Sequence, residues 1–214
     1  MDAKLRSRVS YLFSRFTKDL RTQLSQYVEK ILQTIQDLLA FWNPLETPPQ
    51  LLLQKHEQQQ HLYDDQIFIY ETVSYLVVNS SLDAKLKAQL MRNILAPIVN
   101  TFVGLVQKYA ETGDEKVRLV YATSLNVAMS VATRVSKGFS NLFKVKDCEC
   151  TEIFLEILRI FIQAIPVNTT HKALIHAGIR QYMHRMIIVI DNEVLEYIPV
   201  TIEQFLKVLY YFGF

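Results

Sequence analysis

The side chains that could bind a metal are few and poorly spaced for that task. Cys148 and Cys150 form a C-x-C pair, and His171 and His176 follow only after a long apolar segment. Structural zinc sites usually combine C-x-x-C pairs with closely spaced histidines. The pattern therefore favours ordinary thiols and helix histidines over a zinc site. With two cysteines in the whole chain, a disulfide framework is excluded and a reducing compartment is favoured.

The sequence contains no motif that would indicate an enzyme. We find no G-x-S-x-G, no glycine-rich phosphate loop and no H-E-x-x-H. The close carboxylate pairs, Asp64-Asp65 and Asp191-x-Glu193, lie where helix N-termini are expected, and capping explains them better than acid–base chemistry. We therefore predict no catalytic residue, no cofactor, no metal and no small-molecule substrate.

Basic residues gather in stretches that lack acids, although the formal net charge is only +2. The segments 116–146 and 157–190 contain no Asp or Glu, and the first helix is also mostly basic. Such stretches are commonly solvated faces. Stacked side by side, they could instead bind a phosphate backbone through counterion release. The residues we predict to contact RNA are the basic members Arg134, Lys137, Lys144, Lys146, Lys172, Arg180 and Arg185.

Apolar residues recur at helical spacing along most of the chain, as in Val28, Ile31, Leu32 and Ile35. Glycine and proline are scarce, and Asn-Gly and Asp-Gly hairpin signals are absent. The pattern predicts an all-α fold. No apolar run approaches the roughly 18 to 20 uncharged residues of a membrane span, so we expect no membrane insertion. The aromatic end, from Leu209 to Phe214, suggests a fragment of a longer chain.

Paired in order, the predicted helices form repeated units. They give a helix pair over 1–42, a flexible Pro/Gln-rich loop over 43–63, and HEAT-like repeats over 64–112, 114–166 and 168–214, the last one truncated. The repeats start about 50 residues apart, close to the ~40–47 of HEAT and armadillo repeats. This spacing favours an α-α superhelix, a segment of a HEAT-repeat solenoid. An unrelated helical bundle stays open as an alternative.

Six short segments carry a family resemblance in their order and spacing. They are RVSYLFSRF at 8–16, IQDLL at 35–39, DDQIFIYET at 64–72, LMRNIL at 90–95, RVSKGFSN at 134–141 and HRMII at 184–188. Across nearly the whole chain, the sequence resembles the middle to later part of the exportin-T family, the importin-β-type carriers of transfer RNA. The proline- and glutamine-rich stretch at 48–61 departs from the family pattern.

The resemblance implies a set of partners and a location. A carrier of this family would bind tRNA together with Ran-GTP in the nucleus, pass the nuclear pore repeats and release tRNA in the cytoplasm. A segment from the middle to later part need not contact Ran itself. The family supplies no short motif for the RNA contacts, so those predicted above rest on charge. The alternative function is a protein-binding HEAT scaffold without direct RNA contact in this segment.

Overall fold

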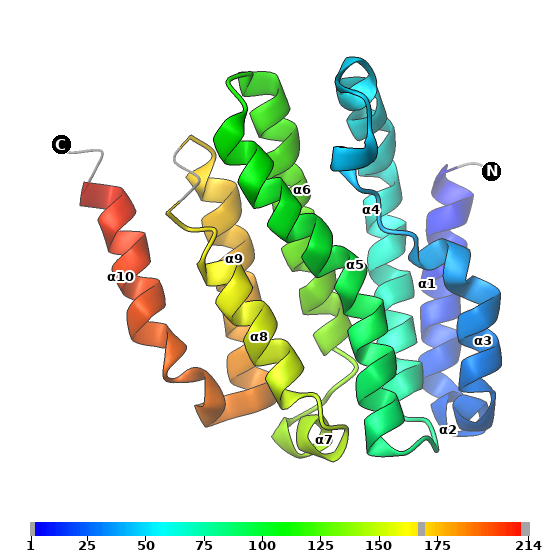
Figure 1. Ribbon diagram of the computed structural model, residues 1–214. Helices are drawn as coiled ribbons and strands as arrows, with labels where there is room; N and C mark the ends of the chain where they lie inside the picture. Colours follow the sequence, from blue (N-terminus) through cyan, green and yellow to red (C-terminus); the bar gives the residue numbers. More distant parts are fainter. Residues whose placement is uncertain (1–2, 167–169, 211–214) are drawn as a thin grey trace.

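The computed structural model describes residues 3–166 and 170–210, and within these ranges it contains helices and no strand (Figure 1). The predicted all-α fold is therefore confirmed. The helices are α1 (Ala3–Asp19), α2 (Arg21–Leu24), α3 (Val28–Ile35), α4 (Pro49–Val78), α5 (Ala84–Glu111), α6 (Glu115–Ser136), α7 (Leu142–Asp147), α8 (Thr151–Ile162), α9 (Lys172–Ile190) and α10 (Tyr197–Tyr210). Short 3-10 turns lie at Ser25–Tyr27, Gln36–Leu39, Pro44–Glu46 and Asp191–Val194.

The long helices are stacked in two layers. Helices α1, α4, α6 and α9 pack side by side in that order and form what we call layer A. Helices α3, α5 and α8 lie on the other side of the stack as layer B, and α10 follows beyond α9 (Figure 1). Because the chain alternates between the layers, the stack is an α-α superhelical segment of the HEAT type.

The cores of neighbouring helices join through aromatic side chains. The rings of Phe102 on α5 and Phe161 on α8 have centroids 4.6 Å apart, and Phe161 in turn packs edge-on against Tyr182 of α9 at 4.9 Å. All three side chains are completely buried. Large aromatic groups of this kind contribute most of the apolar area that holds helix layers together. The hydrophobic core therefore runs continuously between layers A and B.

Aspartate and asparagine caps set the starts of several helices. Asp83 accepts a hydrogen bond from the Leu86 amide at 2.9 Å, and Asp114 accepts from the amides of Lys116 and Val117 at 2.9 and 3.2 Å. These contacts satisfy amides that have no partner inside the helix. Asp83 and Asp114 therefore cap α5 and α6. The predicted capping role of Asp64-Asp65 is wrong, because both residues lie inside α4 and Asp65 pairs with Arg6. Asn168 and Thr169, whose side chains are also of capping type, lie outside the described residues.

The predicted flexible loop at 43–63 is wrong beyond residue 48. Helix α4 begins at Pro49 and continues through the glutamine-rich tract. Proline is favoured in the first helical turn, where its missing N–H has no partner to lose. Glutamine and leucine are also good helix formers. The polar residues of this tract obscure the helical spacing of its apolar residues. One side of the helix is nevertheless buried there, at Leu52 and His56.

The repeats predicted over 64–112, 114–166 and 168–214 stay a prediction. Helices inside the stack contact neighbours on both sides: α5 packs along α6 and also contacts α4, and α8 contacts both α5 and α9. The packing is therefore continuous along the stack, as in a solenoid.

Among the described residues, helix α5 is long and apolar enough to cross a membrane by length and composition alone. Core helices of soluble proteins pass the same test. In this chain Met91, Ile98, Phe102 and Leu105 of α5 are completely buried against protein. Packing therefore accounts for its apolar composition, and the absence of membrane insertion stays a prediction.

Candidate nucleic-acid interface

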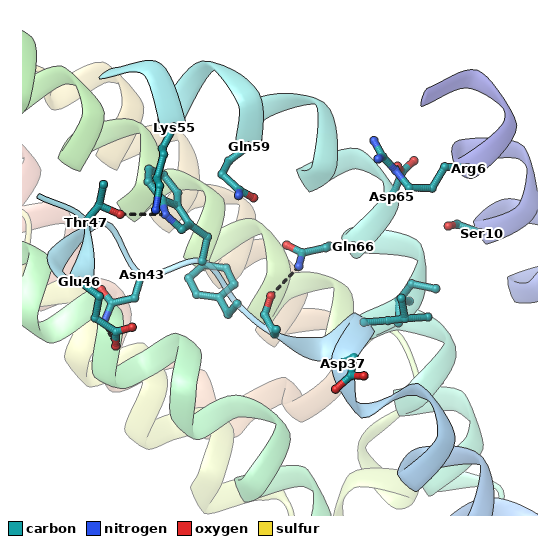
Figure 2. Close-up of a pocket in the computed structure, with 15 residues that line it drawn as sticks. Arg6, Ser10, Asp37, Asn43, Glu46, Thr47, Lys55, Gln59, Asp65 and Gln66 are labelled. Atoms are coloured by element: carbon teal, nitrogen blue, oxygen red, sulfur yellow. Dashed lines mark hydrogen bonds and ion pairs between the residues drawn. The ribbon is translucent and has the colours of Figure 1, made fainter. Parts of the chain in front are cut away.

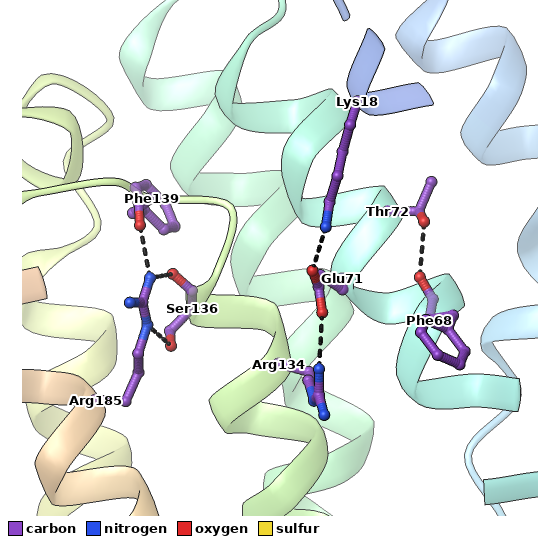
Figure 3. A network of polar contacts seen from close by, with 8 residues as sticks. All are labelled: Lys18, Phe68, Glu71, Thr72, Arg134, Ser136, Phe139 and Arg185. Atoms are coloured by element: carbon purple, nitrogen blue, oxygen red, sulfur yellow. Dashed lines mark hydrogen bonds and ion pairs between the residues drawn. The ribbon is translucent and has the colours of Figure 1, made fainter. Parts of the chain in front are cut away.

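A buried carboxylate joins three helices of layer A. Glu71 of α4 accepts a hydrogen bond from Lys18 of α1 at 2.6 Å and another from Arg134 of α6 at 3.2 Å (Figure 3). The Glu71 side chain is 8% exposed, whereas Lys18 and Arg134 are each about one-third exposed. Charge-assisted hydrogen bonds of this kind fix the relative position of the elements that carry them.

The environment of Glu71 keeps its carboxylate ionised. Burial by itself would raise the pKa of Glu71, but the hydrogen bond and charge of Lys18, the hydrogen bond from Arg134 and the charge of Lys137 outweigh burial and lower it. A carboxylate surrounded by cations favours its charged form. At neutral pH the centre is therefore one negative group among several positive ones.

Arg185 of α9 clamps the end of α6. Its Nε donates to the Ser136 hydroxyl at 3.2 Å, and its Nη2 donates to the carbonyl oxygens of Ser136 at 3.1 Å and Phe139 at 2.6 Å (Figure 3). The last carbonyls of a helix lack partners within the helix and carry the negative end of its dipole. A guanidinium at this position satisfies the carbonyls and holds α9 against α6.

Replacing Arg185 with methionine should lower the free energy of unfolding by about 1.5 kcal/mol, because the partly buried carbonyls lose charged donors. Urea denaturation followed by circular dichroism would measure this. Arg180→Met is the matched control on the same helix, since Arg180 is exposed and, within the described part of the chain, donates only to the carbonyl of His176 in α9 itself. Equal stability of the Arg185→Met variant and the control would contradict the clamp.

Four cations surround Glu71, and we call them with it the basic cluster: Lys18, Arg134, Lys137 and Arg185. Lys137 lies at the end of α6 and is half-buried. Burial lowers the pKa of Lys137, Arg134 lowers it further, and Glu71 opposes them only in part. Four positive groups against one carboxylate leave a strongly positive surface on layer A.

The structure brings together three of the seven predicted RNA contacts, Arg134, Lys137 and Arg185. Lys144 and Lys146 are exposed on α7, and the Lys146 ammonium pairs with Glu193 at 3.0 Å. The remaining two, Lys172 and Arg180, flank a hollow on α9 that Phe205 of α10 also lines. They lie on the side of α9 that faces α10, away from the basic cluster.

Two members of the basic cluster were not among the predicted site residues. Lys18 belongs to the basic first helix, but nothing in its local spacing sets it apart from the other four basic residues there. Glu71 follows an apolar helix pattern and is the sole acid of the cluster. Their partners lie 53 and 63 residues away in sequence, so local periodicity gives no signal for these contacts.

The cysteines and histidines considered for zinc have other roles. Cys148 and Cys150 are free, buried thiols, and burial raises the pKa of Cys150 to about 12. His171 contacts the Tyr109 hydroxyl at 3.1 Å, and the ring of His176 packs on Phe205. Among the described residues, no three His, Cys, Asp or Glu side chains are grouped to hold a metal ion.

A larger pocket of about 550 Å³ lies between α1, α4 and the connection at 36–47 (Figure 2). Several of its polar groups are engaged with one another: Gln66 donates to the Ala40 carbonyl at 2.7 Å, Trp42 donates to the Thr47 hydroxyl at 3.3 Å, and Arg6 pairs with Asp65. These contacts hold the connection onto α4, and we assign the pocket no ligand.

Comparison with known proteins identifies the family. The exportin-T family model matches residues 1–208. The chain belongs to the exportin-T family. It is 43% identical to the exportin-T proteins of Mus musculus and Homo sapiens over 205 residues, which are 96% of this chain and 20% of each relative. Identity to the Danio rerio exportin-T is 39% over 204 residues. The chain therefore spans about a fifth of the length of these relatives.

The exportin-T resemblance and the basic cluster coincide in space. Three of the resembling segments, 64–72, 134–141 and 184–188, supply Glu71, Arg134, Lys137 and Arg185. These segments lie on three different helices of layer A and meet at the end of α6 (Figure 3). The exportin-T assignment from sequence is confirmed, and three of the segments that carry it supply four of the five residues of the basic cluster.

Proposed function

We propose that this chain is part of a nuclear export receptor for tRNA, and that the surface around the basic cluster contacts the RNA backbone. The match to the exportin-T family over residues 1–208 is the observation that carries this proposal. The receptor binds tRNA together with Ran-GTP, passes the repeats of the nuclear pore and shuttles between nucleus and cytoplasm. No covalent chemistry is required for this role.

The mechanism that fits this surface is recognition of shape and backbone charge. Double-stranded RNA is recognised mostly through its shape and its phosphates, since its deep major groove is closed to side chains. A stack of helix pairs provides a continuous surface whose curvature changes when neighbouring helices slide slightly. In this chain, the ion pairs of Glu71 and the hydrogen bonds that Arg185 donates connect all four helices of layer A. A shift of one helix is therefore passed to the next.

The predicted contacts differ in how free their charges are. Lys137, Lys144 and Arg180 form no hydrogen bond or ion pair with an acid among the described residues, so their donors remain available to phosphate. Lys146 is shared with Glu193, while Arg134 and Arg185 hold helices together. We therefore assign Arg134 and Arg185 mainly to positioning, and Lys137 and Lys144 to RNA contact.

Neutralising Lys137 and Lys144 together to glutamine should weaken tRNA binding by the full-length protein about tenfold at physiological salt. It should also reduce the slope of log affinity against log salt by about 1.5, because two phosphate contacts no longer release counterions. The matched control is Lys30→Gln with Lys85→Gln, which removes two exposed lysines from layer B helices. Equal effects of the two pairs would place the RNA contact elsewhere.

One observation favours the alternative of a protein-binding scaffold. Helix α1 exposes an apolar stripe on which Leu5, Val9, Leu12 and Phe16 are each more than half exposed. Spacing of this kind suits an amphipathic helix of another protein segment. If this role is the relevant one, substituting serine at Val9 and Leu12 would impair cargo export in cells while tRNA affinity stays unchanged.

A further inference from the structure

A hollow lies beside the basic cluster, where α6 ends. It has a volume of about 270 Å³ and is lined by Tyr75, Lys137, Gly138, Phe139, Ser140 and Arg185. We call it the α6-end hollow. Its walls come from α4, from α9 and from the turn that follows α6. Three segments far apart in the sequence thus present their side chains to one small volume.

Two cationic groups in the α6-end hollow retain unused donors. Arg185 donates hydrogen bonds from Nε and Nη2 to Ser136 and Phe139. The two N–H groups of Nη1 have no partner among the described residues. The Lys137 ammonium likewise makes no hydrogen bond or ion pair within the described ranges. Because the clamp fixes the guanidinium plane, Nη1 is already oriented before a ligand arrives.

The nearby carboxylate cannot neutralise these two donors. Glu71 already accepts from Lys18 and Arg134, one on each carboxylate oxygen. Lys137 is partly buried and lies in the field of Arg134, Arg185 and Lys18. Holding several like charges together is unfavourable unless an anion compensates them. The hollow therefore offers an external anion both positive charge and unused hydrogen-bond donors.

We propose that the α6-end hollow binds one phosphate group of an RNA backbone, with Lys137 Nζ and Arg185 Nη1 as its cationic donors. Arginine and lysine side by side suit a phosphate because its several oxygens accept from both. Tyr75 and Ser140 also line the hollow, and hydroxyl groups of these residue types can donate to a phosphate. This proposal rests on the proposed tRNA-binding function and assigns one defined phosphate position to it.

The variant that tests this proposal is Lys137→Gln in the full-length protein, with Lys85→Gln as the matched control. Arg185 is left unchanged because its loss would disturb the packing of α6. Inorganic phosphate at constant ionic strength should raise the Tm of the wild type and of Lys85→Gln, since a ligand that binds the folded state stabilises it. It should leave the Tm of Lys137→Gln unchanged. Lys137→Gln should also weaken tRNA binding about fivefold and reduce the salt slope by about 0.8.

The outcomes separate the phosphate site from the wider function. An equal phosphate response in wild type and Lys137→Gln, or none in either, would overturn the phosphate site. Loss of that response with unchanged tRNA affinity would show that the hollow binds free phosphate and would overturn the RNA assignment, while the proposed tRNA function would stand. If the wild type itself fails to bind tRNA, the proposed function fails, and the phosphate measurement still decides whether the hollow is an anion site.

Discussion

Replacing Gly138 with alanine should lower the free energy of unfolding of the chain by about 3 kcal/mol, the largest effect that we expect from a single substitution. A Cβ atom at Gly138 would lie 2.1 Å from the Ser74 hydroxyl oxygen and 2.8 Å from the Ser74 carbonyl carbon. A side chain can rotate away from such a contact, but the backbone of α4 cannot. The end of α6 would have to move off α4, which would disturb the basic cluster next to it.

Urea denaturation followed by helical circular dichroism would measure this loss, and Gly113→Ala is the matched control. A Cβ at Gly113 meets nothing within 4 Å, and this glycine likewise lies outside a helix, in the connection between α5 and α6. Its substitution should leave stability unchanged or raise it slightly, by about 0.5 kcal/mol, through reduced freedom of the unfolded chain. A Gly138→Ala variant as stable as the control would refute the close approach of α4 and α6.

Replacing Glu71 with glutamine should lower the free energy of unfolding at neutral pH by about 2 kcal/mol. Removing one partner of a buried ion pair leaves the remaining charges uncompensated. Here the loss would leave Lys18, Arg134, Lys137 and Arg185 together without a carboxylate. The same substitution makes the surface more positive, so affinity for tRNA should not fall with stability. Urea denaturation of the variant beside the wild type would measure the stability change.

The pH dependence of the Glu71 effect has a defined sign. The folded-state pKa of Glu71 is lowered, so its contribution is fully present above the ordinary value near 4.5 and is lost as the pH falls through the folded value. The stability difference between wild type and Glu71→Gln should therefore be constant from pH 7 to about pH 5 and shrink below that.

The control is Glu156→Gln, whose carboxylate is 56% exposed and lies 3.5 Å from Arg92. Its substitution should change stability by less than about 0.5 kcal/mol at any of these pH values. A constant difference down to about pH 3 would contradict the ionic role of Glu71.

The sequence predicts the helices of this fold well because their signals are local. Asp83 and Asp114 are N-cap residues that mark the starts of helices, and apolar residues recur at helical spacing in most segments. The glutamine-rich part of α4 is not predicted as a helix, because its polar residues interrupt the helical spacing of apolar residues. Glutamine is nevertheless a good helix former.

The basic cluster is only partly visible in the sequence for a related reason. The basic stretches without acids select Arg134, Lys137 and Arg185 as candidate RNA contacts. They do not show which of these side chains donate to a carboxylate or a carbonyl in the folded chain. Lys18 with Glu71, and Arg185 with the end of α6, are contacts between distant segments. Their roles depend on the crossing of α4 and α6, which requires the absence of a side chain at Gly138.

The most direct test of the account is a lysine footprint of the full-length protein with bound tRNA. Acetic anhydride acylates accessible lysine amines, and mass spectrometry of the peptides compares each lysine with and without RNA. We expect protection of Lys137 and Lys144 beside the end of α6, and unchanged labelling of the exposed layer B lysines Lys30 and Lys85. Unchanged labelling of Lys137 and Lys144 in a complex that demonstrably contains tRNA would contradict the claim that this surface contacts RNA.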